Sequence, residues 1–326
     1  MQKIINIYNT QIKEINNIIL KFAQGKSPLI QEISKHLISS GGKRIRPVLL
    51  LMTADLCNQD KNDVILNLAA AVEMIHSATL LHDDVVDNSK MRRNQKTANS
   101  IWDNKASILV GDYIFSVAFQ LMVKSNNLKA LELLAKTSSI MADGEVLQLE
   151  NSNNIKISFE QYLDIIYGKT AILFSSACAV PALISSKKEE EFLSLKEFGK
   201  NLGLIFQMVD DVLDYSAKEQ NIGKEIGSDF FEGKVTLPLI TLYKKSSHID
   251  QKIINQIHQD NLISPKKEQN LKQIMQLINK YDVLNDCQNT IKQYQSKAIK
   301  TLEIFKNNEI KERILSILDY STTRLN

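Results

Sequence analysis

The sequence contains little glycine or proline: 11 of its 326 residues are glycine and 5 are proline. These residue types interrupt regular structure most strongly, so long unbroken elements are expected. Runs that alternate strictly between apolar and polar residues, the pattern of half-buried strands, are also missing from the sequence. The chain is 44% hydrophobic and 24% charged, which excludes a disordered protein and provides for a large core. We predict an all-α fold in which residues 1–326 form a single domain.

Cysteine is scarce as well. Cys57, Cys178 and Cys287 are isolated and lack the CxxC spacing of zinc sites. An odd number of scattered cysteines excludes a disulfide framework and indicates a reducing compartment. The first residues show neither the apolar run of a signal peptide nor the arginine-rich composition of a transit peptide. We therefore expect a cytoplasmic protein.

Charge of one sign is not in large excess, because the net charge is +3 at pH 7. The sequence has no cluster of Lys and Arg interleaved with aromatic residues, so a nucleic-acid partner is not expected. Residues 170–186 form an uncharged stretch that is shorter than a typical membrane span and contains Pro181 and several hydroxyl side chains. We interpret this stretch as a buried core helix.

Apolar residues recur at helical spacing along most of the chain. The pattern predicts an amphipathic N-terminal helix region over residues 1–40, which Gly41 and Gly42 end, and a new helix opening at residues 43–47. Further helices are expected over residues 64–86, 105–124, 128–149, 159–186 and 190–215. Polar loops are expected over residues 88–99, 151–157 and 221–234. The rest of the chain is expected to be helical, with a break near Pro265.

Two acidic runs of the form DDxxD carry most of the functional information. They span residues 83–87 and 210–214, and each lies in apolar, helix-forming sequence. Positions i and i+4 of a helix share a face, so the first and last Asp of each run point the same way. Oxygen ligands without Cys or His in the run suit Mg²⁺, which commonly shares substrate phosphates. One such run is often a solvated helix end, but two predict a site that binds a diphosphate through several magnesium ions.

Basic residues lie beside chain breaks, where loops could present them to phosphates. Four segments combine such a break with Lys or Arg: residues 41–46, 92–93, 168–169 and 223–224. Each alone is typical of a surface turn. Together they provide charge for two phosphorylated substrates, since helix N-termini attract anions and Arg makes bidentate phosphate contacts.

With these motifs, the sequence resembles the trans-type polyprenyl diphosphate synthases over nearly its whole length. The resemblance rests on GGKRIRP at residues 41–47, IHSATLLHDDVVD at 75–87, MRR at 91–93 and FQMVDDVLD at 206–214. Shorter matches are found at residues 144–145, 169–170 and 233–238. One departure is Asn94, where the family usually has glycine, but Asn tolerates left-handed backbone geometry and little effect is expected.

The resemblance implies helices around a deep central cavity, a homodimer and a prenyltransferase activity. Isopentenyl diphosphate is expected to condense onto an allylic diphosphate, with farnesyl diphosphate as primer, giving a long-chain all-trans product for quinone side chains. The resemblance further implies about three Mg²⁺ per site and a transient membrane contact when the product leaves. The departing pyrophosphate is expected to take the proton lost at the end of each condensation.

The resemblance also implies roles for individual residues. The metal ligands are Asp83, Asp87 and Asp210, with Asp84, Asp211 and Asp214 in or near their shell. The allylic diphosphate is assigned to Arg92, Lys169 and Lys224. Isopentenyl diphosphate is assigned to Lys43, Arg46, His76 and Arg93. The reacting centre is assigned to Thr170 and Gln207. For His82, a structural role is the simpler interpretation.

Product length is expected to depend on the helix that precedes the first acidic run. Ala78 lies about 7–8 Å along the helix axis from Asp83, in the expected path of the growing tail. Ala78 and Thr79 are small, whereas short-chain members of the family carry aromatic residues at this level, which predicts a long cavity. A neighbouring helix could supply the cavity floor through Phe115, Phe119 or Met122, although for any single one of them a place in the ordinary core is the slightly favoured interpretation.

Three other classes of protein fit the sequence less well. A terpene cyclase would use the same metals but normally has an asymmetric second motif with Asn, Ser or Thr, and Glu, whereas residues 210–214 read DDVLD. A non-catalytic subunit of a heteromeric synthase typically loses acidic motifs. A helical scaffold would need no carboxylate clusters in apolar sequence.

Overall fold

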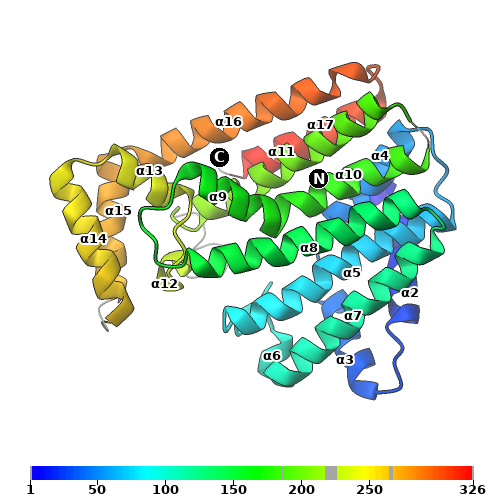
Figure 1. Ribbon diagram of the computed structural model, residues 1–326, viewed down its shortest axis with the longest axis horizontal. Coiled ribbons are helices and arrows are strands. Elements are labelled where there is room, and N and C mark those ends of the chain that lie inside the picture. Colours follow the sequence, from blue (N-terminus) through cyan, green and yellow to red (C-terminus); the bar gives the residue numbers. More distant parts are fainter. Residues whose placement is uncertain (1, 186, 217–225, 264–266, 325–326) are drawn as a thin grey trace. The chain divides into compact units, whose positions relative to one another are not determined.

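The computed structural model describes residues 2–185, 187–216, 226–263 and 267–324 (Figure 1). Nearly all of this part of the chain is helical, which confirms the all-α prediction. The chain divides into two compact units. Unit 1 comprises Met1–Ser139, Leu173–Gly199 and Thr301–Ile317, and unit 2 comprises Ile140–Ile172, Lys200–Lys300 and Leu318–Asn326. A single domain over the whole chain stays a prediction.

Unit 1 contains the first seven helices and one short hairpin. The helices are α1 (Gln2–Ile7), α2 (Asn9–Phe22), α3 (Pro28–Ser39), α4 (Ile45–Leu56), α5 (Asp63–Val86), α6 (Ala98–Ile101) and α7 (Asn104–Lys124). The hairpin pairs β1 (Met91–Arg92) with β2 (Gln95–Lys96). Five helices contain a boundary between the units: α8 (Leu128–Glu150), α10 (Ile172–Ile184), α11 (Glu189–Leu213), α16 (Val283–Thr301) and α17 (Glu309–Thr323).

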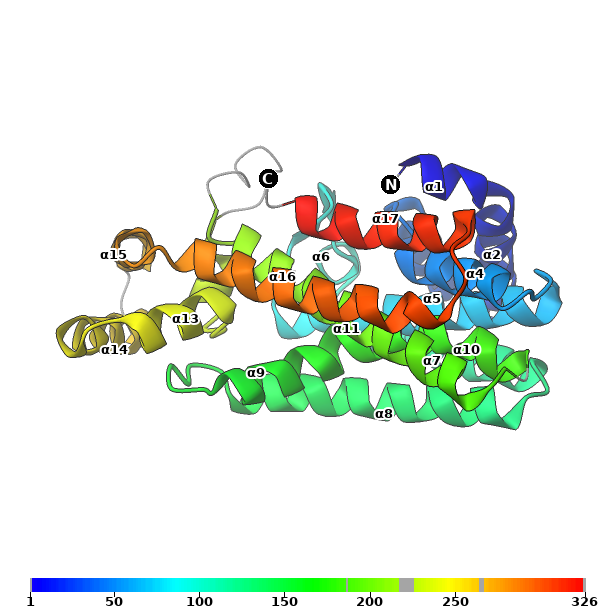
Figure 2. The same cartoon turned by 90° about the horizontal axis from the view of Figure 1, so that it is seen from above.

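Unit 2 holds the remaining helices. Its α14 and α15 contact each other and lie side by side in Figure 1, and Figure 2 shows α16 continuing from α15. Its elements are α9 (Phe159–Ile166), the π-helix η1 (Tyr167–Ala171), α12 (Ser228–Phe231), α13 (Leu237–Lys245), α14 (His248–Ile263), α15 (Lys267–Lys280) and all of α16 except Thr301. The 3₁₀ turn η3 (Leu302–Ile304) follows in unit 1.

Helix α5 forms the centre of unit 1 and packs closely against α7 (Figure 1). The side chain of Asn62 caps the N-terminus of α5 by accepting hydrogen bonds from the amides of Val64 and Ile65. At the other end, the two helices meet at Gly111, where a Cβ atom would lie 2.4 Å from Nε2 of His82. This contact supports the structural role expected for His82, and it fixes the end of α5 that carries the first acidic run.

Several element boundaries differ from the sequence prediction. Residues 1–40 form three helices rather than one, because the chain breaks at Tyr8 and again before the Ser27–Pro28 pair that opens α3. The amphipathic pattern itself holds, since Ile12, Ile15 and Ile19 are buried. The predicted loop at 88–99 contains the hairpin and the start of α6, and the loop at 221–234 contains α12. Pro265 and residues 217–225 lie outside the described residues.

By length and composition alone, three segments are apolar enough to cross a membrane: Asp63–Val86, Asn104–Lys124 and Phe159–Ile184. In the protein, 67%, 50% and 78% of their apolar windows are buried. Residues 170–182 are all buried, as predicted for a core helix.

Candidate active site

The first acidic run ends α5, and its three carboxylates differ in their surroundings. Asp84 is buried and accepts hydrogen bonds from Arg92, whose Nε and Nη2 atoms lie 2.9 and 2.8 Å from Oδ1. Burial raises the pKa of Asp84, and the guanidinium of Arg92 opposes that rise. Asp83 and Asp87 are only half-buried. Asp84 therefore anchors the hairpin to α5, while Asp83 and Asp87 remain accessible to solvent.

A cluster of basic side chains surrounds His76, one to two turns before the acidic run. Burial, followed by the charges of Arg46, Arg93, Arg92 and Arg44, lowers the pKa of His76 well below its usual range, so the imidazole is neutral at pH 7. Arg44 forms a mostly buried ion pair with Glu73 at 2.7 Å. The structure thus brings together four residues that the sequence assigned to substrate: Arg46, His76, Arg92 and Arg93.

The loop before α4 explains the paired glycines of the first basic segment. Gly41 and Gly42 have φ values of 75° and 134°, which L-residues rarely adopt. A Cβ atom on Gly42 would lie 2.5 Å from the guanidinium of Arg93, which donates a hydrogen bond to the carbonyl of Gly41. Because α4 begins at Ile45, Lys43 precedes the helix, and its expected place on the first helical turn is wrong.

The turn of the hairpin accommodates Asn94. Arg93 and Asn94 both have left-handed backbones, with φ values of 51° and 61°. Asn is one of the residues that adopt this conformation most readily. The departure from the family's glycine is therefore compatible with the turn that positions Arg93.

In unit 2, α8 crosses the π-helix η1 at two glycines. A Cβ atom on Gly144 would lie 2.7 Å from the Cα of Gly168, so neither position has room for a side chain. The close approach brings Nζ of Lys169 to 2.8 Å from both carboxylate oxygens of Glu145. Single π-turns within helices often occur at functional sites, and this one carries Lys169 and Thr170.

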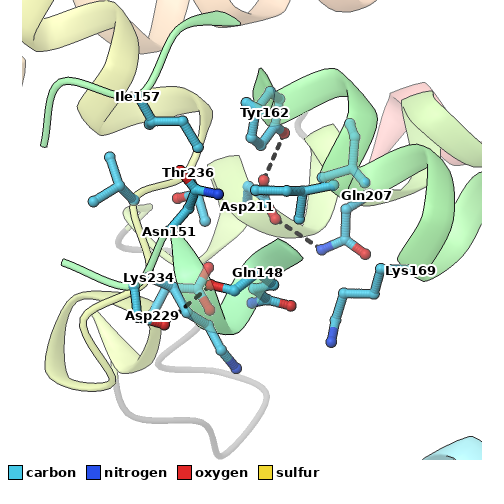
Figure 3. Close-up of a pocket in the computed structure, with 14 residues that line it drawn as sticks. Gln148, Asn151, Ile157, Tyr162, Lys169, Gln207, Asp211, Asp229, Lys234 and Thr236 are labelled. Carbon is cyan, nitrogen blue, oxygen red and sulfur yellow. Dashed lines mark hydrogen bonds between the residues drawn. The ribbon is translucent and has the colours of Figure 1, made fainter. Parts of the chain in front are cut away.

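The second acidic run lies at the end of α11, and both carboxylate oxygens of its Asp211 accept hydrogen bonds. Asp211 is buried and accepts hydrogen bonds from the hydroxyl of Tyr162 at 2.6 Å and from Nε2 of Gln207 at 2.8 Å (Figure 3). Oε1 of Gln207 accepts from the hydroxyl of Thr170 at 2.7 Å. Burial raises the pKa of Asp211 to about 6, which the two hydrogen bonds oppose.

The other two carboxylates of this run contact different segments. Buried Asp214 accepts hydrogen bonds from the amide and hydroxyl of Ser228 and from the amide of Asp229. These bonds connect the start of α12 to the end of α11. Burial, followed by the charge of Asp214, raises the pKa of Asp229 well above its usual range. Asp210 is half-buried and forms a 2.7 Å ion pair with Arg324.

A cavity of about 70 Å³ opens beside Asp211 (Figure 3). Its wall includes the predicted site residues Lys169, Gln207 and Asp211. Tyr162, Asp229 and Lys234 also line it. The arrangement places cationic, amide and carboxylate groups around one small space, as expected where a phosphorylated substrate binds.

The comparisons with known proteins agree with this geometry. A model of the polyprenyl synthetase family matches residues 27–278. The chain belongs to the polyprenyl synthetase family. It is 35% identical to an octaprenyl diphosphate synthase of Haemophilus influenzae, over 99% of this chain and 97% of that protein. This membership confirms the resemblance read from the motifs, and it makes the protein a prenyltransferase.

Solved structures of the polyprenyl synthetase family match the whole fold. A decaprenyl diphosphate synthase from Rhodobacter capsulatus is 36% identical, with a TM-score of 0.93 and coverage of 100% of this chain and 99% of that one. A polyprenyl synthase from Caulobacter crescentus, solved with calcium and isoprenyl diphosphate, is 36% identical, with a TM-score of 0.92 and coverage of 99% and 97%.

The donor set fits a hard divalent cation that is shared with a ligand. Among the described residues, no group of three or more His, Cys, Asp or Glu side chains is arranged to hold a metal by itself. Unit 1 nonetheless offers the half-buried carboxylates of Asp83 and Asp87, and unit 2 separately offers that of Asp210. Mg²⁺ commonly binds to one or two carboxylates and completes its shell with water and phosphate oxygens. A polyprenyl synthetase of this composition would therefore bind its metal together with substrate.

Some residues of the site were missed at the level of sequence. Lys234 could have been found, because it belongs to the matching segment at 233–238. Tyr162, Asp229 and Arg324 lie outside the motifs, and only tertiary contacts reveal them. Lys224, assigned to the allylic diphosphate, lies outside the described residues.

Proposed function

We propose that this chain is a long-chain all-trans polyprenyl diphosphate synthase, which adds isopentenyl diphosphate repeatedly to an allylic diphosphate. The observation that carries this proposal is the basic cluster of Arg46, His76 and Arg93, present together with both complete acidic runs. A cyclase ionises one substrate and needs no second anion site. The relatives named as octaprenyl and decaprenyl diphosphate synthases support a long product.

The chemistry follows from the charges in the site. Asp83, Asp87 and Asp210 would hold Mg²⁺, about three ions with the diphosphate bound, and the metal would supply Lewis-acid stabilisation of the departing pyrophosphate. Arg92 and Lys169, with Lys224, would hold the allylic diphosphate. Lys43, Arg46 and Arg93 would bind isopentenyl diphosphate, together with neutral His76 as a hydrogen-bond donor.

The reacting carbons need a site that tolerates a developing positive charge. The hydroxyl of Thr170 and the amide oxygen of Gln207 present partial negative charge for that purpose. The double bond of isopentenyl diphosphate would attack the allylic cation, and the pyrophosphate would then accept the proton.

The direct test is an assay of the purified protein with labelled isopentenyl diphosphate, farnesyl diphosphate and Mg²⁺. Chromatography of the product should show a chain longer than four isoprene units, and a cyclised terpene or no product would contradict the proposal.

The two diphosphate sites should separate in their kinetics. Lys43→Ala or Arg46→Ala is expected to raise KM for isopentenyl diphosphate by about tenfold and KM for the allylic substrate much less, because one charged phosphate contact is lost. Lys169→Ala should do the reverse. Steady-state kinetics with each substrate varied in turn measures both effects. Lys245→Ala, which breaks a surface pair with Asp286, is the charge control. Equal changes in both KM values would contradict the assignment.

We also propose that the protein works as a homodimer through α7. This helix is as apolar as α5, yet only half of its apolar window is buried. Ile108, Leu109 and Val123 are among its exposed side chains. Exposed apolar side chains on one long helix are typical of a subunit interface, and a second copy of the chain would cover them.

The dimer prediction is tested by introducing a charge into that face. Leu109→Glu is expected to convert a dimer into a monomer, with a halved mass in sedimentation equilibrium, because an unpaired carboxylate is costly to bury. Leu193→Glu, at an exposed leucine of α11, is the matched control and should leave the mass unchanged. A wild-type protein that sediments as a monomer would exclude the proposal.

The remaining expectations concern the setting of the enzyme. We propose a cytoplasmic enzyme whose apolar product contacts a membrane transiently on release and becomes the side chain of a quinone. The absence of a paired cysteine pattern in the sequence supports the reducing compartment. Cell fractionation, with prenyl chain lengths of quinones measured after depletion of the protein, tests both expectations.

A further inference from the structure

An unbroken row of hydrogen bonds joins Tyr162 to the reacting centre. The hydroxyl of Tyr162 donates to Oδ2 of Asp211, and Nε2 of Gln207 donates to Oδ1 of the same carboxylate. The hydroxyl of Thr170 donates to Oε1 of Gln207. The three distances lie between 2.6 and 2.8 Å, and Tyr162, Thr170 and Asp211 are buried. Figure 3 shows the two bonds at Asp211 beside the cavity.

Each bond in this row restricts the next one. The terminal amide of a glutamine rotates easily, since its last torsion is broad and nearly two-fold. A carboxylate only accepts hydrogen bonds, so Asp211 must face the NH₂ group of Gln207 and not its oxygen. The carbonyl oxygen is thereby turned toward Thr170, which uses one of its two lone pairs. The second lone pair is left to face positive charge.

Tyr162 determines which way the carboxylate of Asp211 itself is turned. It comes from α9, 49 residues before Asp211 in the chain, and its hydroxyl occupies Oδ2. With that oxygen engaged, Oδ1 is directed at Gln207. Without the hydroxyl, the carboxylate could rotate or bind water, and the amide would lose its fixed orientation.

We propose that Tyr162 is a positioning residue, which acts through Asp211 to hold the amide oxygen of Gln207 toward the developing allylic cation. The inference rests on the proposed function, because the cation forms only in prenyl transfer. Preorganised dipoles of this kind stabilise the charge of a transition state at no cost of reorganisation. The hydroxyl of Tyr162 is engaged by Asp211, so its effect on turnover should depend on Gln207.

A double-mutant cycle tests this dependence. Tyr162→Phe is expected to lower kcat about tenfold while both KM values stay within about twofold, since the interaction serves the transition state. In a Gln207→Ala background, the same change should alter kcat by less than about twofold, because no amide remains to be oriented. Two residues that acted independently would instead give effects that multiply.

A matched control removes the same kind of bond elsewhere in unit 2. Tyr281 donates its hydroxyl to buried Asp250, so Tyr281→Phe also breaks a tyrosine–aspartate hydrogen bond, and it should leave kcat unchanged. Thermal unfolding of each variant shows that the fold is kept. An unchanged kcat in Tyr162→Phe, or a multiplicative cycle, would overturn the inference. Either result, obtained with a wild-type enzyme that makes polyprenyl products, leaves the proposed function standing.

Discussion

Asp83→Ala is expected to lower turnover by at least about 10³-fold while the protein stays folded. The carboxylate is half-buried at the end of α5, one turn from Asp87 on the same face. Removing it deletes a ligand of the cation that stabilises the departing pyrophosphate. It also relieves repulsion between two like charges, so the free energy of unfolding should not fall. The measurement is kcat at saturating Mg²⁺ together with thermal unfolding.

The neighbouring carboxylates would be poorer probes of metal binding. Asp84 pairs with Arg92, Asp211 with Tyr162 and Gln207, and Asp214 with the loop at Ser228. Their removal would leave these partners unpaired and confound catalysis with folding. Asp63→Asn, at the exposed start of the same helix, removes the same charge and should leave kcat unchanged. Near-normal condensation by Asp83→Ala would exclude its role as a metal ligand.

The two acidic runs show how far sequence reasoning extends. Their four-residue spacing and apolar flanks correctly placed each run on a helix, because helical periodicity is a local property. Which carboxylates of each run are buried and hydrogen-bonded depends on partners that are distant in the chain. Tyr162 is one such partner, 49 residues from Asp211. No spacing rule encodes a contact of that kind.

For the basic residues too, local motifs predicted part of the arrangement and tertiary contacts determine the rest. The motif match assigned Arg46, His76 and Arg93 to one substrate and Arg92 to the other. The structure places the charges of these three arginines around one neutral imidazole. The π-turn at Lys169 was not predictable, because it depends on the backbone contact between Gly144 and Gly168. A local pattern predicted one continuous helix there. Tertiary packing changed it.

Ala78→Phe is expected to shorten the product to about three or four isoprene units. Ala78 is fully buried in α5, about 7–8 Å along the axis from Asp83, and Thr79 is half-buried beside it. If the tail runs along this face, a phenyl ring would stop it at that level. Ionisation occurs closer to the metals, so early condensations should keep near-normal rates while later ones cease. Chromatography of labelled products measures the length, and thermal unfolding checks the overpacking cost of about 1–3 kcal/mol.

A second substitution on the same face tests whether product length follows the position of the blocking residue along α5. Ala71 is also fully buried and lies one heptad earlier, about 10.5 Å farther from the acidic run. Ala71→Phe should therefore give a product longer than that of Ala78→Phe and no longer than that of the wild type. The wrong order of lengths would place the tail elsewhere.

The opposite change should lengthen the product if α7 provides the floor. Met122 is fully buried and Phe119 is half-buried. The rings of Phe119 and Phe115 meet edge to face, with their centroids 5.4 Å apart. Met122→Ala or Phe119→Ala would open space at a cost of about 2–5 kcal/mol in unfolding free energy for lost packing. Longer chains from either variant would identify the floor. An Ala78→Phe enzyme with wild-type product length would show instead that the tail does not follow this face of α5, and the small residues at positions 78 and 79 would then not account for a long product.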